Sequence, residues 1–343
     1  MPARKVDYII IGQGLAGSVL AHQLILRNKK ILVIDNNHHQ SSSKVAAGII
    51  NPITGPRLVL TDTFNDTYPQ AQQYYSLLEK TLGITLWQEL KQHRLIQTNA
   101  QAEYLHKRST DIHYQHTLGS TIFSPYFESD FGSVEINQSA IIDSKLLIQT
   151  AQQFLIENQS YDQKKLDYQQ LIITDNGFRI DDTVASHIIF CEGFQAINNP
   201  WLADLPFKLS KGEILTVETN KPVTHLLNWG NWLVPFGHDT KLGSNYQWGD
   251  LTDTLSDSIK TQLLQSLLSN TTVQGRIINH EAGIRPTTTQ RKPFIGPITN
   301  LSGAYCFNGF GSKGCLLIPR FAELFCDHLL NNTPLDTNLT QWL

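Results

Sequence analysis

Residues 6–35 read VDYIIIGQGLAGSVLAHQLILRNKKILVID, and this stretch decides the fold of the first part of the chain. The apolar run at residues 8–11 predicts a strand that is buried on both faces, as in the middle of a parallel sheet. A glycine-rich turn and a helical pattern follow, and a second apolar run at residues 31–34 ends in an acid. Strand, turn, helix, strand and acid in this order predict a unit that binds a dinucleotide.

The glycine-rich turn has the G-x-G-x-x-G spacing of such sites. Its first glycine permits a tight turn, its second lets the backbone approach a pyrophosphate, and its third lets the helix pack closely on the strand. The start of the helix directs free N–H groups and a positive dipole end at the phosphates. The acid at the end of the second strand is expected to accept hydrogen bonds from a ribose. The predicted contacts of an adenine dinucleotide are Gly12, Gly14, Leu15, Ala16, Gly17 and Asp35.

The composition bounds the remaining possibilities. A chain of 343 residues with 41% hydrophobic residues predicts one large or two medium globular domains. A formal charge of −3 gives no general electrostatic reason to expect nucleic acid or an anionic membrane as a partner. Polar residues interrupt the apolar N-terminal stretch, so it is interpreted as neither a membrane span nor a signal segment. We expect a cytoplasmic protein whose four cysteines are buried thiols rather than disulfides or metal ligands: Cys191, Cys306, Cys315 and Cys326.

The loop after the second strand is rich in small and polar residues. Residues 36–56 read NNHHQSSSKVAAGIINPITGP, with hydroxyls suited to a diphosphate and small residues that let a bulky ring approach the backbone. An acid-ended strand that leads into a Ser/Ala/Gly loop resembles the D-amino-acid oxidase and glycine oxidase superfamily of FAD enzymes. The resemblance implies FAD contacts at Ser42, Ser43, Ala47 and Gly48. A covalent link to cysteine is not expected, because no cysteine lies in residues 283–296, the region that matches sarcosine oxidase.

The middle of the chain mixes helical and strand patterns. A helical pattern runs from Thr61 to about Arg94, and an amphipathic helix is expected from about Asp143. Asn176-Gly177 predicts a hairpin turn. Residues 186–194, SHIIFCEGF, resemble the segment by which these flavoproteins close over the cofactor, although one more core strand and turn is the alternative. The resemblance implies that Cys191 and Gly193 lie at the dinucleotide.

Two strands around a turn are predicted in residues 232–248, WLVPFGHDTKLGSNYQW. TKLGSN resembles the segment of monomeric sarcosine oxidase that carries a lysine near the flavin. The resemblance implies that Lys241 promotes the reaction of reduced flavin with oxygen; a structural lysine is the alternative. That family has a histidine four residues later, where this chain has Asn245. Tyr246 and Trp248 either line a substrate pocket or pack, and Tyr246 is taken as a catalytic candidate.

Residues 281–297, EAGIRPTTTQRKPFIGP, resemble the G-x-R-P…P-x-I-G segment of glycine oxidase-like proteins. In glycine oxidase the arginine of this motif grips the substrate carboxylate, which implies that role for Arg285. A guanidinium suits the role because its planar fork binds a carboxylate bidentately. A structural ion pair is the alternative.

Residues 305–325, YCFNGFGSKGCLLIPRFAELF, predict a strand, a glycine-rich turn and a helix. The turn can bring backbone N–H groups and a helix start to the pyrimidine edge of a flavin, where positive charge stabilises the anionic reduced form. The predicted contacts here are Gly309, Gly311, Ser312, Lys313 and Gly314. The same turn also resembles the C-terminal FAD domain of the bifunctional enzyme that modifies the wobble uridine of tRNA.

These patterns together predict an α/β fold with discontinuous domains. A Rossmann-like FAD domain is expected from residues 1–60, 130–205 and 275–343, and a substrate domain with a mixed or antiparallel sheet from 61–129 and 206–274. The predicted function is oxidation of the C–N bond of a small amino acid or N-substituted glycine by hydride transfer to non-covalent FAD, with oxygen or another electron acceptor. Demodification of a carboxymethylaminomethyl group on tRNA, a flavin-binding module without turnover and an NAD(P) dehydrogenase are the alternatives. The oligomeric state is left open.

Overall fold

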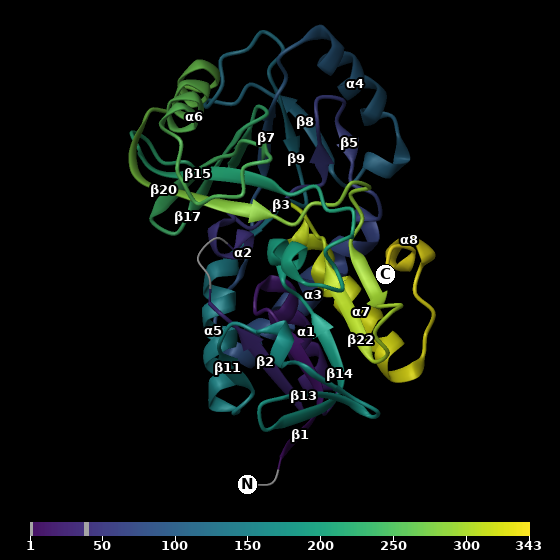
Figure 1. Cartoon of the computed structure of the whole chain (residues 1–343). Helices are drawn as coiled ribbons and strands as arrows, with labels where there is room; N and C mark the ends of the chain where they lie inside the picture. The colour runs from purple at the N-terminus through teal and green to yellow at the C-terminus, as the bar shows by residue number, and fades with distance from the viewer. Residues whose placement is uncertain (1–2, 38–40) are drawn as a thin grey trace.

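The computed structural model describes residues 3–37 and 41–343. These residues form two stacked lobes, each built on its own large sheet (Figure 1). The lower lobe contains the N-terminal strand and the long helices α1, α3, α5 and α7, whereas α4 and α6 lie at the top of the upper lobe. The predicted α/β class is confirmed.

The middle strands of the lower sheet are parallel and buried on both faces. β1 (Arg4–Ile11) pairs with β2 (Ile31–Asp35) on one side and with β14 (Thr183–Phe190) on the other, and β22 (Ala304–Asn308) pairs in turn with β14. Alternate residues of β1 enter two different core clusters, which explains why these strands read as continuous apolar runs. The margins of the sheet are β11 (Tyr161–Gln163), β21 (Phe294–Pro297), β12 (Ile172–Thr174) and β13 (Gly177–Ile180). The last two form the hairpin predicted at Asn176-Gly177.

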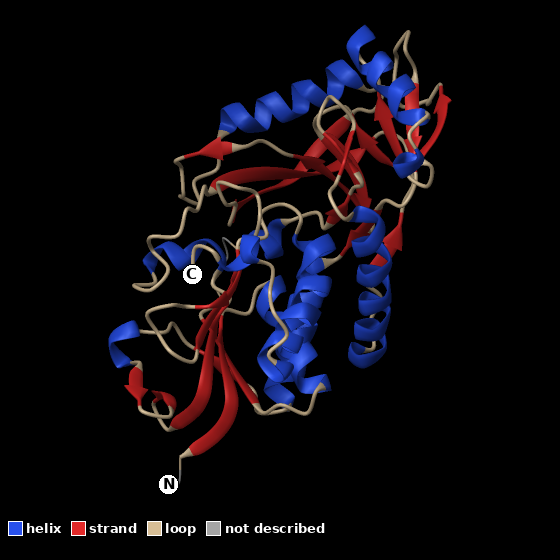
Figure 2. Cartoon of the chain, turned by 90° about the vertical axis from the view of Figure 1, so that its right-hand side faces the viewer, coloured by secondary structure: helices blue, strands red, loops and turns tan. Residues whose placement is uncertain are grey.

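Long helices gather on one side of the lower sheet (Figure 2). They are α1 (Leu15–Leu26), α3 (Phe64–Leu82), α5 (Ser144–Glu157) and α7 (Gly314–Asn331). The predicted start of α5 is confirmed, because the carboxylate of Asp143 accepts a hydrogen bond of 2.9 Å from the backbone N–H of Leu146.

The predicted helix from Thr61 to about Arg94 is too long. It ends at Leu82, because Gly83 takes a left-handed conformation with φ of 68° and closes the last turn. The chain then forms two short strands, β6 (Trp87–Glu89) and β7 (Gln92–Leu95). Apolar residues spaced three to four apart predict a helix, but after the helix ends at Gly83 the same spacing is also compatible with the short strands β6 and β7.

The upper lobe is a mostly antiparallel sheet with the order β19-β15-β18-β17-β16-β7-β9-β8, and β20 pairs with β15. The bounds are β8 (Leu118–Ile122), β9 (Ser133–Ile136), β15 (Ser210–Thr219), β16 (Leu226–Asn228), β17 (Trp232–Phe236), β18 (Asp239–Gly243), β19 (Gln247–Trp248) and β20 (Gly275–Arg285). The back of the sheet packs on α6 (Asp257–Asn270) through Leu263 and Leu267. Its front meets the lower lobe, where Gly283 of β20 approaches α2 (Ser42–Val45).

The two sheets divide the chain at other points than the predicted domain boundaries. β9 and β20 pair within the upper sheet, whereas the sequence predicts residues 130–205 and 275–343 in the FAD domain. Conversely, α3 lies in the lower core, whereas the sequence predicts residues 61–129 in the substrate domain. The hydroxyl of its Tyr75 donates to the carbonyl of Cys315 in α7 at 2.9 Å. Hydrophobic periodicity identifies an element but not its pairing partner.

Smaller elements complete the described part of the chain. β3 (Ile49–Ile50), β10 (Ala140–Ile142) and β6 form a three-stranded sheet, and β4 (Ile53–Thr54) pairs with β5 (Val59–Leu60). The remaining helices and turns are α4 (Asn99–Ser109), α8 (Thr337–Thr340), η1 (Ile112–Tyr114), η2 (Tyr168–Gln170) and η3 (Gly193–Asn198). The four cysteines are buried and free, as predicted. Within residues 3–37 and 41–343, the helices are too short or too polar to cross a membrane.

Candidate active site between the lobes

A groove runs along the carboxyl ends of the parallel strands in the lower lobe. It is lined by the glycine-rich turn after β1, the end of β2, the loop that follows it, the turn after β14 and the turn before α7. In open parallel sheets, ligands bind at this edge. The groove therefore lies where the sequence predicts a dinucleotide.

The first glycine-rich turn is held by close backbone contacts. A Cβ at Gly12, whose φ is +99°, would lie 2.6 Å from the carbonyl oxygen of Cys191, and a Cβ at Gly17 would lie 1.9 Å from that of Gly12. By contrast, the nearest atom to a Cβ at Gly14 is a serine oxygen 3.6 Å away. Gly12 and Gly17 thus serve packing, whereas Gly14 leaves backbone open to the groove.

Asp35 holds the turn from the side. Its carboxylate accepts hydrogen bonds from the backbone N–H of Gln13 at 2.8 Å and from that of Asn37 at 2.6 Å. Asp35 also lines the groove. A carboxylate has lone pairs for further bonds, so the predicted contact with a ribose stays compatible with this geometry.

Two helix starts converge on the groove. Neither α1 nor α7 has a side-chain hydrogen bond at its N-cap, whereas Thr98, Asp143 and Ser256 cap α4, α5 and α6. The side chain of Ser43 accepts from the N–H of Leu15 at 3.2 Å. Apart from the N–H of Leu15, the first turns of α1 and α7 therefore present N–H groups and positive dipole ends to a ligand.

A second pocket continues from the groove into the space between the lobes. The lower lobe contributes residues of the loop 42–49 and of the turn 311–315, and the upper lobe contributes residues of β15, β17, β20 and the loop after β18. Most of the lining is apolar or glycine. Among the described residues that line this pocket, Arg285 alone carries a charge.

The guanidinium of Arg285 is enclosed on several sides. Its Cζ lies 4.3 Å from the centre of the Tyr246 ring, and its Nη2 donates to the hydroxyl of Ser244 at 2.7 Å. Its Nη1 donates to the carbonyl of Asn245 at 3.1 Å. Across the described residues, Nε has no protein partner, so the Nε–Nη2 side of the fork remains suited to a carboxylate. Burial lowers the pKa of this arginine from 12.5, although arginine remains charged in proteins.

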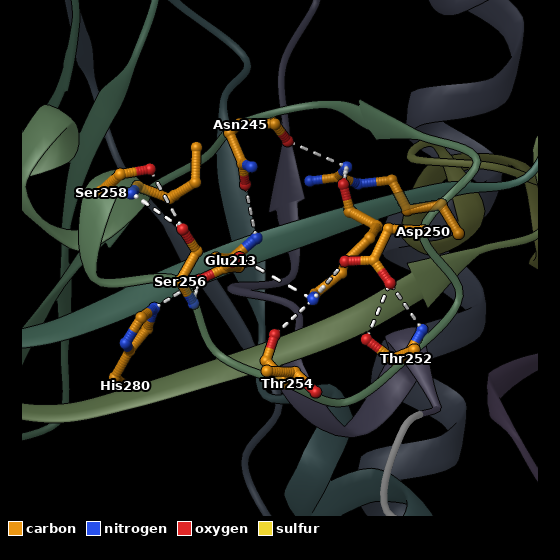
Figure 3. Close-up of polar contacts among 11 residues, drawn as sticks. Glu213, Asn245, Asp250, Thr252, Thr254, Ser256, Ser258 and His280 are labelled. Atoms are coloured by element: carbon orange, nitrogen blue, oxygen red, sulfur yellow. Dashed lines mark hydrogen bonds and ion pairs between the residues drawn. The ribbon is translucent and has the colours of Figure 1, made fainter.

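A buried polar network is centred on Glu213 (Figure 3). Glu213 lies on the face of the sheet opposite to Arg285, because Arg285 pairs with Ser210 and successive strand residues alternate between faces. Nζ of Lys211 contacts Asp250 at 2.9 Å, and the Glu213 carboxylate lies 2.7 Å from His280. The backbone N–H of Glu213 donates to the side chain of Asn245 at 2.7 Å. Asn245 therefore joins the network to Arg285. The hydrogen bond from Lys211 is the largest cause that lowers the pKa of Asp250 to about 2.

The structure brings most of the predicted site residues to these two cavities. The groove is lined by Gly12, Gly14, Leu15, Ala16, Asp35, Ser42, Ser43, Cys191, Gly193, Gly311 and Gly314. The second pocket is lined by Ala47, Gly48, Tyr246, Arg285 and Ser312, and it shares Leu15, Ser42, Ser43, Gly311 and Gly314 with the groove.

Four predicted residues lie outside the lining of both cavities: Gly17, Lys241, Gly309 and Lys313. Nζ of Lys313 donates to the Thr61 hydroxyl at 3.3 Å, and a Cβ at Gly309 would meet Thr288 at 2.8 Å. Lys241 is buried, and its Nζ lies 4.1 Å from the centre of the Phe236 ring. Burial lowers its pKa from 10.5. Its predicted role with oxygen stays a prediction.

Several lining residues were missed by the sequence reasoning. In the groove they include Asn308, Lys164, Lys165 and Tyr168; in the second pocket they include Gly212, Ile214, Trp232, Ser244, Gly283 and Ser144. Gly212 offered a signal, since a glycine inside a strand marks close approach of another group. The others come from segments that meet only in the folded chain.

A groove suited to a dinucleotide, joined to a mostly apolar pocket that holds Arg285, is consistent with an oxidoreductase that uses a dinucleotide cofactor. The family model described as FAD dependent oxidoreductase, DAO, matches residues 7–328. The chain therefore belongs to the DAO family of FAD-dependent oxidoreductases.

Solved structures show the same fold. Iminodiacetate oxidase from Chelativorans sp. BNC1 has a TM-score of 0.79 at 18% identity, covering 97% of this chain and 98% of that one. Glycine oxidase from Geobacillus kaustophilus has a TM-score of 0.79 at 16% identity, covering 99% and 100%. Glycine oxidase from Bacillus cereus ATCC 14579 has a TM-score of 0.77 at 17% identity, covering 97% of each chain.

The residues present fit FAD. The uncapped start of α1 and the open backbone at Gly14 suit the diphosphate, and Asp35 suits the ribose. The uncapped start of α7 and the small residues of loop 46–48 flank the second pocket, where a flavin ring would reach the lobe interface.

Proposed function

We propose that the chain oxidises the C–N bond of a small amino acid or N-substituted glycine. One observation carries this proposal: among the described residues that line the pocket next to the groove that suits FAD, Arg285 is the single charged side chain. A carboxylate is the complement of such a guanidinium, and the amine of the substrate would then lie in apolar surroundings that favour its uncharged form.

Bound FAD supplies the oxidising power, because flavin accepts the hydride that leaves the carbon next to nitrogen. The roles of the protein are to bind, to orient and to exclude water. Arg285 would fix the carboxylate, while the side chains of Ile214 and Trp232 form apolar walls of the pocket. No carboxylate or histidine stands among the described residues of this pocket, so the substrate nitrogen would enter without its extra proton.

Anaerobic reduction of the bound flavin tests this function. The purified protein would be mixed without oxygen with a panel of amino acids and N-alkylglycines, and the flavin band would be followed. Bleaching by one class identifies the substrate family. Bound flavin that none of them bleaches contradicts the proposal and favours the tRNA-linked or non-catalytic alternatives.

The role of Arg285 is tested by the variants Arg285→Ala and Arg285→Lys. We expect both to bind FAD, because the groove is formed by other residues. Loss of a bidentate charged pair would raise the substrate KM by about tenfold or more, with Lys recovering part of the loss. Unchanged kinetics in both variants would rule out a carboxylate contact.

A further inference from the structure

Two large aromatic side chains lie exposed beside the second pocket. Tyr246 is 56% exposed and Trp248 is 50% exposed, and the core clusters of the described residues include neither. Their ring centres are 6.2 Å apart and their planes meet at 26°. Aromatic rings at the mouth of a pocket supply contact area for a ligand at small entropic cost.

The strand register and the contacts of Tyr246 place both rings on the face of the sheet that carries Arg285. Ser210 of β15 pairs with Arg285 on one side and with Trp248 of β19 on the other. Directly paired residues of antiparallel strands point to the same face, so Trp248 shares the face of Arg285. Tyr246 precedes β19, and its contacts place it between the two, because its ring centre lies 4.3 Å from Cζ of Arg285 and 6.2 Å from the ring centre of Trp248. Arg285, Tyr246 and Trp248 therefore form a continuous row that starts inside the pocket and ends outside it.

The outer end of this row carries a second cation. Nζ of Lys208 lies 4.8 Å from the centre of the Trp248 ring. Lys208 is exposed, so its side chain can move aside for a ligand at small cost. The row thus consists of a buried guanidinium for a carboxylate, two nearly parallel rings and an exposed ammonium group.

We propose that the natural substrate carries a planar aromatic or heteroaromatic group, which stacks on Tyr246 and Trp248 while its carboxylate binds Arg285. This inference rests on the proposed function and narrows its substrate class. A planar group matches two rings whose planes nearly agree, whereas a saturated ring of similar size is too thick to make the same contact. Glycine and N-methylglycine would reach Arg285 but leave Trp248 uncovered.

Three substrates distinguish the effect of aromatic stacking from the effect of substituent size. N-methylglycine, N-benzylglycine and N-(cyclohexylmethyl)glycine would each reduce the holoenzyme anaerobically, and the reduction rate divided by the dissociation constant would be compared. We expect N-benzylglycine to exceed both others by about fivefold or more. In Trp248→Ala the ratio of N-benzylglycine to N-methylglycine should fall by about fivefold. In the control Trp342→Ala, which removes a tryptophan that is 45% exposed near the C-terminus, this ratio should stay constant.

A binding measurement keeps the test independent of turnover. Phenylacetate and cyclohexylacetate carry the carboxylate but no amine, and their binding would be followed through the flavin absorption spectrum. Phenylacetate should bind more tightly, and Trp248→Ala should remove the difference. The proposal of an aromatic substrate would be overturned if the two acids bound equally. It would also be overturned if Trp248→Ala left the ratio of N-benzylglycine to N-methylglycine unchanged. If N-methylglycine still bleaches the flavin in that case, the proposed function survives.

Discussion

The guanidinium of Arg285 occupies the space that a side chain at position 212 would fill. A Cβ built on Gly212 would lie 2.0 Å from Nη2 and 2.3 Å from Cζ of Arg285. The two neighbours of this glycine, Lys211 and Glu213, point to the opposite face of the sheet and are almost fully buried. Glu213 lies within the polar network (Figure 3). β15 therefore leaves space for the arginine on one face at Gly212, while its other face makes the ionic contacts of Lys211 and Glu213.

Gly212→Ala should displace Arg285 without disturbing FAD. A new methyl group at this place collides with the guanidinium, and the arginine must leave its hydrogen bonds to Ser244 and Asn245. We expect the substrate KM to rise by about tenfold or more while the flavin spectrum is retained. Steady-state kinetics and absorption spectra measure both. The matched control is Gly275→Ala on β20, where the nearest atom would be Val217 Cβ at 3.3 Å; an equal effect there would argue against a local collision.

Gly17 and Gly14 should fail in different ways. Alanine at position 17 would place its methyl group 1.9 Å from a backbone carbonyl oxygen. Gly17→Ala should therefore lower the free energy of unfolding by about 3 kcal/mol and the unfolding temperature with it. Among the described residues, a methyl group at position 14 would meet only the hydroxyls of Ser43 and Ser41, at 3.6 and 3.8 Å. Gly14→Ala should therefore fold but bind FAD more weakly. Thermal unfolding without added FAD, and FAD titration, distinguish the two. Normal FAD affinity in Gly14→Ala would contradict a diphosphate contact at this backbone.

Glu192 should make stability depend on pH. Burial raises its pKa from 4.5 to about 7, against the opposing hydrogen bonds from Tyr168 and Asn199. The folded protein then keeps a proton that the unfolded chain releases between these values, so the free energy of unfolding falls as pH rises through this interval. Glu192 also lines the groove and keeps some contact with water, so we expect a modest slope.

Replacement of the carboxyl group tests that slope. In Glu192→Gln the difference in urea midpoint between pH 5 and pH 8 should shrink, because the group that titrates has been removed. Glu103→Gln, a change on the exposed surface of α4, serves as the control. If the urea midpoint changed equally between pH 5 and pH 8 in the wild type and in Glu192→Gln, the carboxyl group of Glu192 would not contribute to the pH dependence of stability.

Lys241→Met tests the predicted role with oxygen. A buried cation near a flavin favours negative charge that develops on oxygen, so its removal should slow reoxidation of the reduced protein by about tenfold or more. Reduction by substrate should change much less, since Lys241 lies outside the lining of the second pocket. Stopped-flow absorption measures the two half-reactions separately. If the reoxidation rate is equal in wild type and variant, the ammonium over Phe236 is a packing contact.

Local patterns were sufficient for the elements that form the lower sheet. β1, β2, β14 and β22 can be predicted from their apolar runs because both faces of these strands are buried. The turn at Gly12, Gly14 and Gly17 can be predicted because its backbone geometry requires glycines at this spacing. The cap at Asp143 and the turn at Asn176-Gly177 are equally local. Such features depend on residues that are close in the chain.

Which distant segments meet depends on the tertiary structure. The sequence was enough to predict the dinucleotide unit, the resemblance to FAD enzymes and Arg285 as a carboxylate-binding candidate. It did not show that α3 packs in the lower core, that β20 joins the upper sheet, or that Gly212 lies beneath the arginine 73 positions later, at Arg285. These relations depend on strand register, because a pairing shifted by one residue would turn Gly212 and Trp248 to the opposite face, away from the pocket.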